Sequence, residues 1–191
     1  MRIEPAAPTY QLAETMQGLT ASIPARRNWF VLLFMCAWLG GWVLGEVSAI
    51  TRISNPTGDG PKEFLAVWLI GWTLGGGWVL ACVVWQLFGR EVITIAAGEL
   101  IYRVEALGLG RSRSFTSYQI SRVRVVDFSS MPFSRQWNMV PPLFGAGYGP
   151  IAFDYGARTY RLGSSLDEAG ARQLLVRLAP RLPSGASLEG A

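Results

Sequence analysis

The side chains that could carry out catalysis in this chain are few, and they lack the companions that catalysis needs. The sequence contains no histidine, which excludes histidine-based acid–base catalysis and histidine-containing metal sites. Its two cysteines form no CxxC or other metal-binding spacing. Four carboxylates of the second half have no companion base or metal spacing: Asp127, Asp154, Asp167 and Glu168. We therefore expect a protein that is not an enzyme and that takes no cofactor, metal or small-molecule substrate.

Glu46 stands out because it is the one ionisable residue within two long apolar runs. A helix of about 20 mostly apolar residues crosses the hydrocarbon core of a membrane, which is about 30 Å thick. The runs therefore predict a transmembrane helical hairpin over 28–88, with helices over 28–50 and 64–88. Residues 55–61 are dense in turn formers and predict the bend that joins the two helices.

An acid inside a membrane span is a candidate functional residue, because burying it there is costly. Two roles for Glu46 remain open at this point. In the first, its side chain reaches the membrane surface, towards Arg52. In the second, it makes a polar contact with Thr73 or with a partner subunit.

Glycines in GxxxG spacing predict where the two helices pack. Gly41 and Gly45 lie in the first helix, and Gly71 and Gly75 lie in the second. Small residues at this spacing allow helix backbones to approach closely. Counted inward from the two ends of the hairpin, Gly45 is level with Trp72. We expect the small faces of the helices to meet at this depth.

Basic residues at both ends of the hairpin predict its orientation. Arg26 and Arg27 precede the first helix, and Arg90 follows the second. Because loops rich in lysine and arginine stay in the cytoplasm, both chain termini are expected there. A cleaved export signal is the alternative, since the two arginines precede an apolar run and residues 47–49 resemble a cleavage site.

The two ends of the chain carry little periodic pattern. Residues 1–27 contain three prolines, and we expect a flexible or surface-lying arm there. A short amphipathic helix over residues 9–19 is the alternative. Residues 183–191 are expected to form a disordered tail.

From residue 89 the composition changes to short alternating runs, which predict antiparallel strands followed by one helix. The tight turn Ala97–Gly98 joins the first two strands. The helix is expected over 165–182, with Ser165 and Glu168 as a capping box. Residues 129–149 form an irregular apolar loop that could hide one strand. The expected strands are 91–96, 99–106, 111–117, 120–128, 150–155 and 157–162.

This order resembles the pleckstrin-homology (PH) fold, and specifically the bacterial PH-like domains found directly after paired membrane helices. The resemblance is carried by Gly89–Ile95, Glu99-Leu100, Tyr118–Ile120 with Val123-Arg124, Gly149–Phe153, Arg161–Gly163 and Leu166–Ala169. It implies a PH-like antiparallel β-barrel or sandwich over 89–182, capped by the C-terminal helix. It also implies an uncharacterised bacterial family of the inner membrane. The long loop over 129–149 departs from that pattern.

Two functions follow as expectations. The first is a structural or assembly subunit, a scaffold whose hairpin and cytoplasmic PH-like domain bind a membrane-protein partner or a second copy. The alternative is a sensor of anionic lipid headgroups, since residues 89–191 contain twelve arginines and only eight acidic residues. A nucleic-acid partner is not expected. The candidate lipid or partner contacts are Arg111, Arg113, Arg122, Arg124 and, in a loop that could instead cover a sheet edge, Phe133, Trp137 and Phe144.

Overall fold

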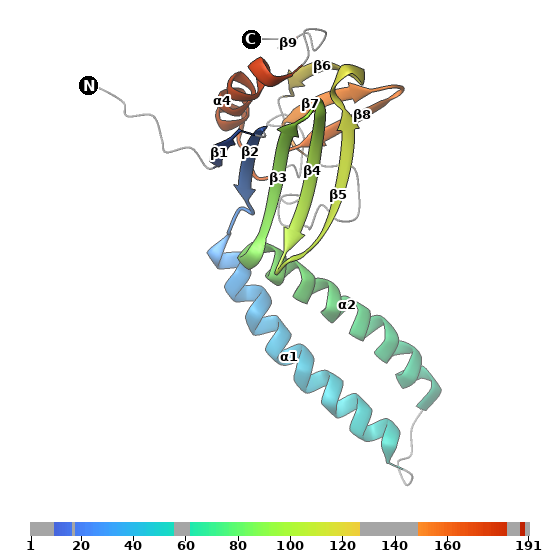
Figure 1. Ribbon diagram of the computed structural model, residues 1–191. Helices are drawn as coiled ribbons and strands as arrows, with labels where there is room; N and C mark the ends of the chain where they lie inside the picture. Colours follow the sequence, from blue (N-terminus) through green and yellow to red (C-terminus); the bar gives the residue numbers. More distant parts are fainter. Residues whose placement is uncertain (1–9, 17, 56–61, 127–148, 183–187, 190–191) are drawn as a thin grey trace, which may run out of the picture. The chain divides into compact units, whose positions relative to one another are not determined.

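The computed structural model describes residues 10–16, 18–55, 62–126, 149–182 and 188–189. The chain divides into two compact units (Figure 1). One is the helical hairpin, residues 27–87. The other is a β-rich unit built from residues 1–26 together with residues 88–191. The bend over 55–61 and the loop contacts Phe133, Trp137 and Phe144 lie outside the described residues, apart from Asn55.

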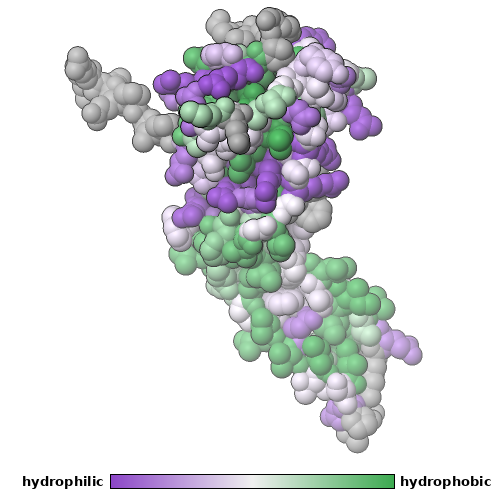
Figure 2. Space-filling model, in the orientation of Figure 1, coloured by the Kyte–Doolittle hydropathy of each residue, from purple (hydrophilic) through white to green (hydrophobic). Residues whose placement is uncertain are grey.

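The hairpin consists of two helices, α1 (Trp29–Ser54) and α2 (Lys62–Phe88), each long and apolar enough to cross a membrane. With 26 residues, α1 is about 39 Å long, which exceeds the hydrocarbon thickness. Asn28 caps α1 by accepting a hydrogen bond from the Val31 amide. Figure 2 shows hydrophobic residues covering both helices. The predicted hairpin is confirmed, and each helix extends further towards the bend than expected.

The first sheet is antiparallel, with the strand order β1-β2-β3-β4-β5. Its centre follows the predicted pattern: β3 (Gly89–Ala96), β4 (Glu99–Ala106) and β5 (Leu109–Thr116) are joined by two-residue turns. In both turns the two central residues have positive φ, at Ala97 and Gly98 and at Leu107 and Gly108. This geometry matches the right-handed twist of paired strands.

The expectation of a flexible or surface-lying arm over 1–27 is wrong for residues 11–15 and 18–24. Residues Gln11–Thr15 form β1 and Gly18–Pro24 form β2, and β2 pairs with β3 along its whole length. Leu19, Ala21 and Ile23 of β2 are buried, so the strand alternates in the way that a half-buried sheet requires. A helix over residues 9–19 is likewise wrong.

The helical hairpin is therefore inserted between two neighbouring strands of one sheet. Pro24 at the end of β2 is paired with Arg90 of β3, and the Ala25 amide donates to the Gly89 carbonyl at 2.9 Å. Cleavage of an export signal at residues 47–49 would detach β1 and β2 from this sheet. The strand pairing thus favours the uncleaved hairpin over the export signal.

The second sheet has the order β8-β7-β6-β9. It contains β6 (Ile120–Val125), β7 (Ile151–Tyr155), β8 (Arg158–Leu162) and the two-residue β9 (Leu188–Glu189), which runs parallel to β6. The 3-10 turn η1 (Ser117–Gln119) connects β5 to β6. The expected disordered tail is wrong at β9, and the rest of that tail lies outside the described residues.

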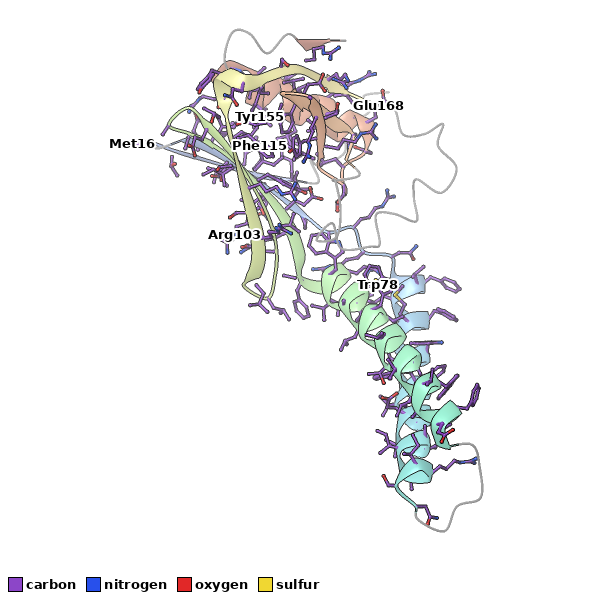
Figure 3. All side chains as sticks on the ribbon, turned by 90° about the vertical axis from the view of Figure 1, so that its right-hand side faces the viewer. Met16, Trp78, Arg103, Phe115, Tyr155 and Glu168 are labelled. Carbon is purple, nitrogen blue, oxygen red and sulfur yellow. The ribbon has the colours of Figure 1, made fainter. Side chains whose placement is uncertain are left out.

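The two sheets face each other across a hydrophobic core, and they do not close into a barrel. No strand of one sheet pairs with a strand of the other in the described part of the chain. Phe115 of β5 contacts Phe153 and Tyr155 of β7, with ring centroids 5.2 and 5.3 Å apart. Figure 3 shows Phe115 and Tyr155 in the region between the sheets. The prediction of a closed β-barrel is therefore wrong, and the unit consists of two packed sheets and a helix.

The C-terminal helix α4 spans Glu168–Leu178 and is shorter than the expected 165–182, with the 3-10 turn η3 (Ala179–Arg181) after it. The capping box is wrong, because Asp167 caps the helix by accepting from the Gly170 amide at 2.8 Å. The Ser165 hydroxyl instead accepts from the Arg26 amide at 3.2 Å. Ala171, Leu174 and Leu178 of α4 are buried in the core.

Candidate functional sites

The intramembrane acid has a partner on the other helix. The Thr73 hydroxyl lies 2.6 Å from Oε1 of Glu46 and 2.8 Å from the Leu69 carbonyl. Of the two roles that the sequence left open for Glu46, the structure shows the polar contact with Thr73. The second carboxyl oxygen of Glu46 is buried and has no hydrogen-bond partner among the described residues. This polar pair fixes the rotation of α1 relative to α2 at one point.

The helices of the hairpin pack through two tryptophans and two glycines, one of each from each helix. The Trp42 indole donates to the Trp72 carbonyl at 3.0 Å, and the Trp72 indole lies 3.4 Å from the Trp42 carbonyl. A Cβ added to Gly45 would meet Trp72 at 3.3 Å, and one added to Gly76 would overlap Trp42 at 2.0 Å. Each indole therefore occupies the space that a glycine leaves on the facing helix.

Only one of the four predicted packing glycines takes part in this contact. Gly45 does, at the depth that counting from the hairpin ends predicts. A Cβ at Gly41, Gly71 or Gly75 would have nothing within 4 Å among the described residues. In the part of the chain that the structure describes, these three glycines take no part in the packing of α1 against α2, where the indoles of Trp42 and Trp72 fill the contact. Gly76, next to Gly75, is the second glycine that the packing needs.

Arg122 and Arg124 are held by an acidic residue of the neighbouring strand. The Arg122 guanidinium lies 2.8 Å from Asp154, and that of Arg124 lies 3.4 Å away. The Thr159 hydroxyl donates to the same carboxylate at 2.7 Å. This hydrogen bond is the main cause that holds the pKa of Asp154 below its usual value; burial opposes it, and the charges of Arg124 and Arg122 add to it. Both arginines are thus paired within the domain, although one carboxylate balances only one of their two positive charges.

Replacing Asp154 by asparagine should remove part of the acid sensitivity of the β-rich unit. A carboxyl whose folded pKa is lowered stabilises the fold above its unfolded pKa of about 3.9, and this stabilisation is lost as the pH falls towards the folded value. The midpoint of thermal unfolding, measured from about pH 6 to pH 3, should fall less steeply for Asp154→Asn than for the wild type. Thr159→Val should act in the same direction. An unchanged slope in both variants would contradict this role.

Arg111 and Arg113 differ from the previous pair. Both are exposed on β5, the edge strand of the first sheet, and neither has an ion-pair partner in the part of the chain that the structure describes. They lie on the same side of β5 as the buried Phe115, since side chains alternate along a strand. Of the predicted basic contacts, these two are the ones left available to bind an anion.

A second ion-pair cluster joins β3 and β4. The buried Glu105 pairs with Arg90 and, at 2.6 Å, with Arg103, and both arginines are more than half exposed. Figure 3 shows Arg103 on the first sheet. The two-residue turn Ala97–Gly98 sets the register that places Arg90 opposite Glu105. The Arg90–Glu105 ion pair could therefore have been predicted from the sequence by counting residues outward from this turn.

Glu91 forms a buried network that sequence reasoning did not single out. Its side chain is 0 % exposed and accepts hydrogen bonds from the amides of Gly163 and Ser164 at 2.9 Å, from the Ser164 hydroxyl, and from the Tyr102 hydroxyl at 2.8 Å. Burial raises the pKa of Tyr102, and the adjacent Glu91 charge raises it further. The Glu91 network ties β3 to the turn before α4, which makes it a structural anchor rather than a reactive site.

No group of three or more Cys, Asp and Glu side chains gathers to hold a metal among the described residues. Cys36 is exposed and Cys82 is buried, and the two are not bonded to each other. Comparison with protein families, with curated proteins and with solved structures found no match for this chain.

Proposed function

We propose that this protein is a non-enzymatic membrane protein that acts as an assembly subunit or scaffold. In this proposal the hairpin crosses a bacterial inner membrane with both termini in the cytoplasm, as the arginines at residues 26, 27 and 90 favour. The β-rich unit is a PH-like domain that binds a partner protein. Two sheets with a C-terminal helix support that interpretation at the level of architecture.

The observation that carries the proposal is the open glycine face of α2. The hairpin uses Gly45 and Gly76 for its own packing, whereas Gly71 and Gly75 face nothing among the described residues. Residues four apart lie on the same side of a helix. Glycines at this spacing in a membrane helix allow another helix to approach closely. The second copy or membrane-protein partner is expected to pack there.

Replacing Gly71 and Gly75 together by leucine should abolish this assembly. The added side chains have room within the hairpin, so the fold should persist while the approach of a second helix is blocked. After mild-detergent extraction, native electrophoresis and cross-linking should show a larger species for the wild type and only the single chain for the double variant. Gly77→Leu is the matched control, because Gly77 is equally open but lies about 200° around the helix from Gly75.

The proposal fails if the wild type itself runs as a single chain, or if the double variant keeps the larger species. The lipid-sensing function remains the second candidate, and one observation favours it. Arg111 and Arg113 are exposed and have no acidic partner within the described ranges of the chain, in contrast to Arg122 and Arg124.

A further inference from the structure

The turn between β4 and β5 presents two exposed leucines. Leu107 and Leu109 are 63 % and 81 % exposed. Leu107 has a φ of 53°, in the left-handed region that asparagine and glycine adopt more readily than leucine. At the opposite end of β4, the turn Ala97–Gly98 has the same backbone geometry but no large apolar residue (Figure 1). The leucines therefore stabilise neither the turn nor the core of the domain.

Strand register places this turn beside the point where the chain leaves α2. The helix ends at Phe88, and the next residue, Gly89, is the paired neighbour of Ala106. Paired residues lie about 5 Å apart across an antiparallel ladder. If α2 crosses a membrane, Gly89 lies at the membrane boundary. Leu107 directly follows Ala106, the residue that is paired with Gly89. Chain connection and strand pairing therefore keep the leucines within a few residues of the membrane boundary.

Basic residues follow the leucines along the same sheet. Arg111 lies two residues beyond Leu109 on β5, a step of about 7 Å, which is close to the thickness of a headgroup layer. Arg113 is one such step further. On β4, the strand that pairs with β5, Glu105 is buried and already bonded within the domain, and the exposed Glu99 is paired with Thr116, beyond Arg113 and further from the turn. The charges of Arg111 and Arg113 therefore remain available to phosphate.

We propose that the β4–β5 turn is a membrane contact. Leu107 and Leu109 enter the boundary between headgroups and acyl chains of the leaflet from which α2 emerges. Arg111 and Arg113 bind the phosphates of anionic lipids above them. An apolar tip followed by arginines is the arrangement by which interfacial segments hold to anionic membranes. The inference rests on the hairpin crossing a membrane and does not require a protein partner.

The test places a polarity-sensitive fluorophore on a single cysteine in the full chain, after Cys36 and Cys82 are replaced by alanine. The probe is attached at Leu109→Cys, with Ala97→Cys as the matched probe in the other turn. The protein is reconstituted in vesicles of phosphatidylcholine with phosphatidylglycerol. Lipids brominated near the headgroup should quench the probe at 109 and leave the probe at 97 unquenched.

Two variants then test the leucine and the arginines separately. Leu107→Asn suits the left-handed turn position, so the domain should stay folded while quenching at 109 falls. Arg111→Gln with Arg113→Gln should reduce quenching in anionic vesicles to the level seen in pure phosphatidylcholine. Replacing Arg158 and Arg177, two exposed arginines outside this sheet, by glutamine removes the same charge and should have no such effect.

Equal quenching at 109 and 97 would overturn the membrane contact. Shielding of the probe at 109 that occurs only in native membranes, and not in pure lipid vesicles, would assign the turn to a protein partner and also overturn it. Unchanged quenching in the Arg111 and Arg113 variant would overturn the phosphate contact. Loss of the glycine-dependent assembly would leave all of these results unaffected, so the two proposals fail separately.

Discussion

Replacing Glu91 by alanine should lower the stability of the turn before α4 by about 3–5 kcal/mol, because each buried donor left without an acceptor costs about 1–3 kcal/mol and these costs are not fully additive. The carboxylate has four donors, from Gly163, Ser164 and Tyr102. Two of them are the backbone amides of Gly163 and Ser164, which have no other acceptor among the residues that the structure describes. Hydrogen exchange of peptides spanning residues 158–178 in the full chain measures this opening directly.

Graded variants separate the network from general damage to the sheet. Tyr102→Phe removes one donor and leaves three, and should cost about 1–2 kcal/mol. Glu91→Gln keeps the shape but presents a donor to other donors, and should fall between these values. Glu99→Ala, an exposed acid on β4, should change stability by less than about 0.5 kcal/mol. Faster exchange in all four variants, or in none, would show that Glu91 does not hold this turn.

Local patterns in the sequence predict the parts of this fold that depend on near neighbours. The turn Ala97–Gly98 sets the pairing of β3 with β4, and equal depth from the hairpin ends places Gly45 against Trp72. Composition predicts the two spans, because length and hydrophobicity decide them. Each of these predictions needs only a count along the chain.

The features that sequence reasoning missed depend on partners that are distant in the chain. β2 pairs with β3, and the whole helical hairpin separates the two strands in the sequence. Because β3 lies so far from β2 in the chain, sequence reasoning interprets the alternating pattern of β2 as part of a flexible arm. Glu91 meets Gly163 and Ser164 from 72 and 73 residues away. Arg124 meets Asp154 in the same manner, 30 residues away. In the sequence alone, where that contact is not visible, Arg122 and Arg124 have the same alternate spacing as Arg111 and Arg113.

The insertion of the hairpin into the sheet brings together the chain segments on either side of it. The turn before α4 is bonded to both chain segments that flank the two helices. Glu91, which follows α2, accepts from the Ser164 amide, and the amide of Arg26, which precedes α1, donates to the Ser165 hydroxyl. The Ala25–Gly89 hydrogen bond closes the same two segments on each other. These bonds hold together, within the β-rich unit, the chain segment that leads into α1 and the one that follows α2.

Replacing Gly76 by alanine should destabilise the hairpin by about 1–3 kcal/mol, the usual cost of forcing extra atoms into a packed contact. The new Cβ would lie 2.0 Å from the Trp42 ring, which must move and give up its hydrogen bond to the Trp72 carbonyl. Gly77→Ala is the matched control one residue away, where the new Cβ meets nothing within 4 Å of the described residues and lies off the face proposed to bind a second helix. It should be neutral or stabilising by up to about 1 kcal/mol, because alanine favours a helix over glycine.

The two alanine variants thus test the contact by the sign of their effects. Unfolding by sodium dodecyl sulfate from mild detergent, followed by tryptophan fluorescence, should shift to lower detergent fraction for Gly76→Ala only. Trp42→Phe removes the second ring of the indole, so Gly76→Ala should cost less in that background than in the wild type, a coupling that a double-mutant cycle measures. Equal shifts for Gly77→Ala and Gly76→Ala would mean that helix propensity, and not the fit of Trp42 onto Gly76, governs the stability of the hairpin.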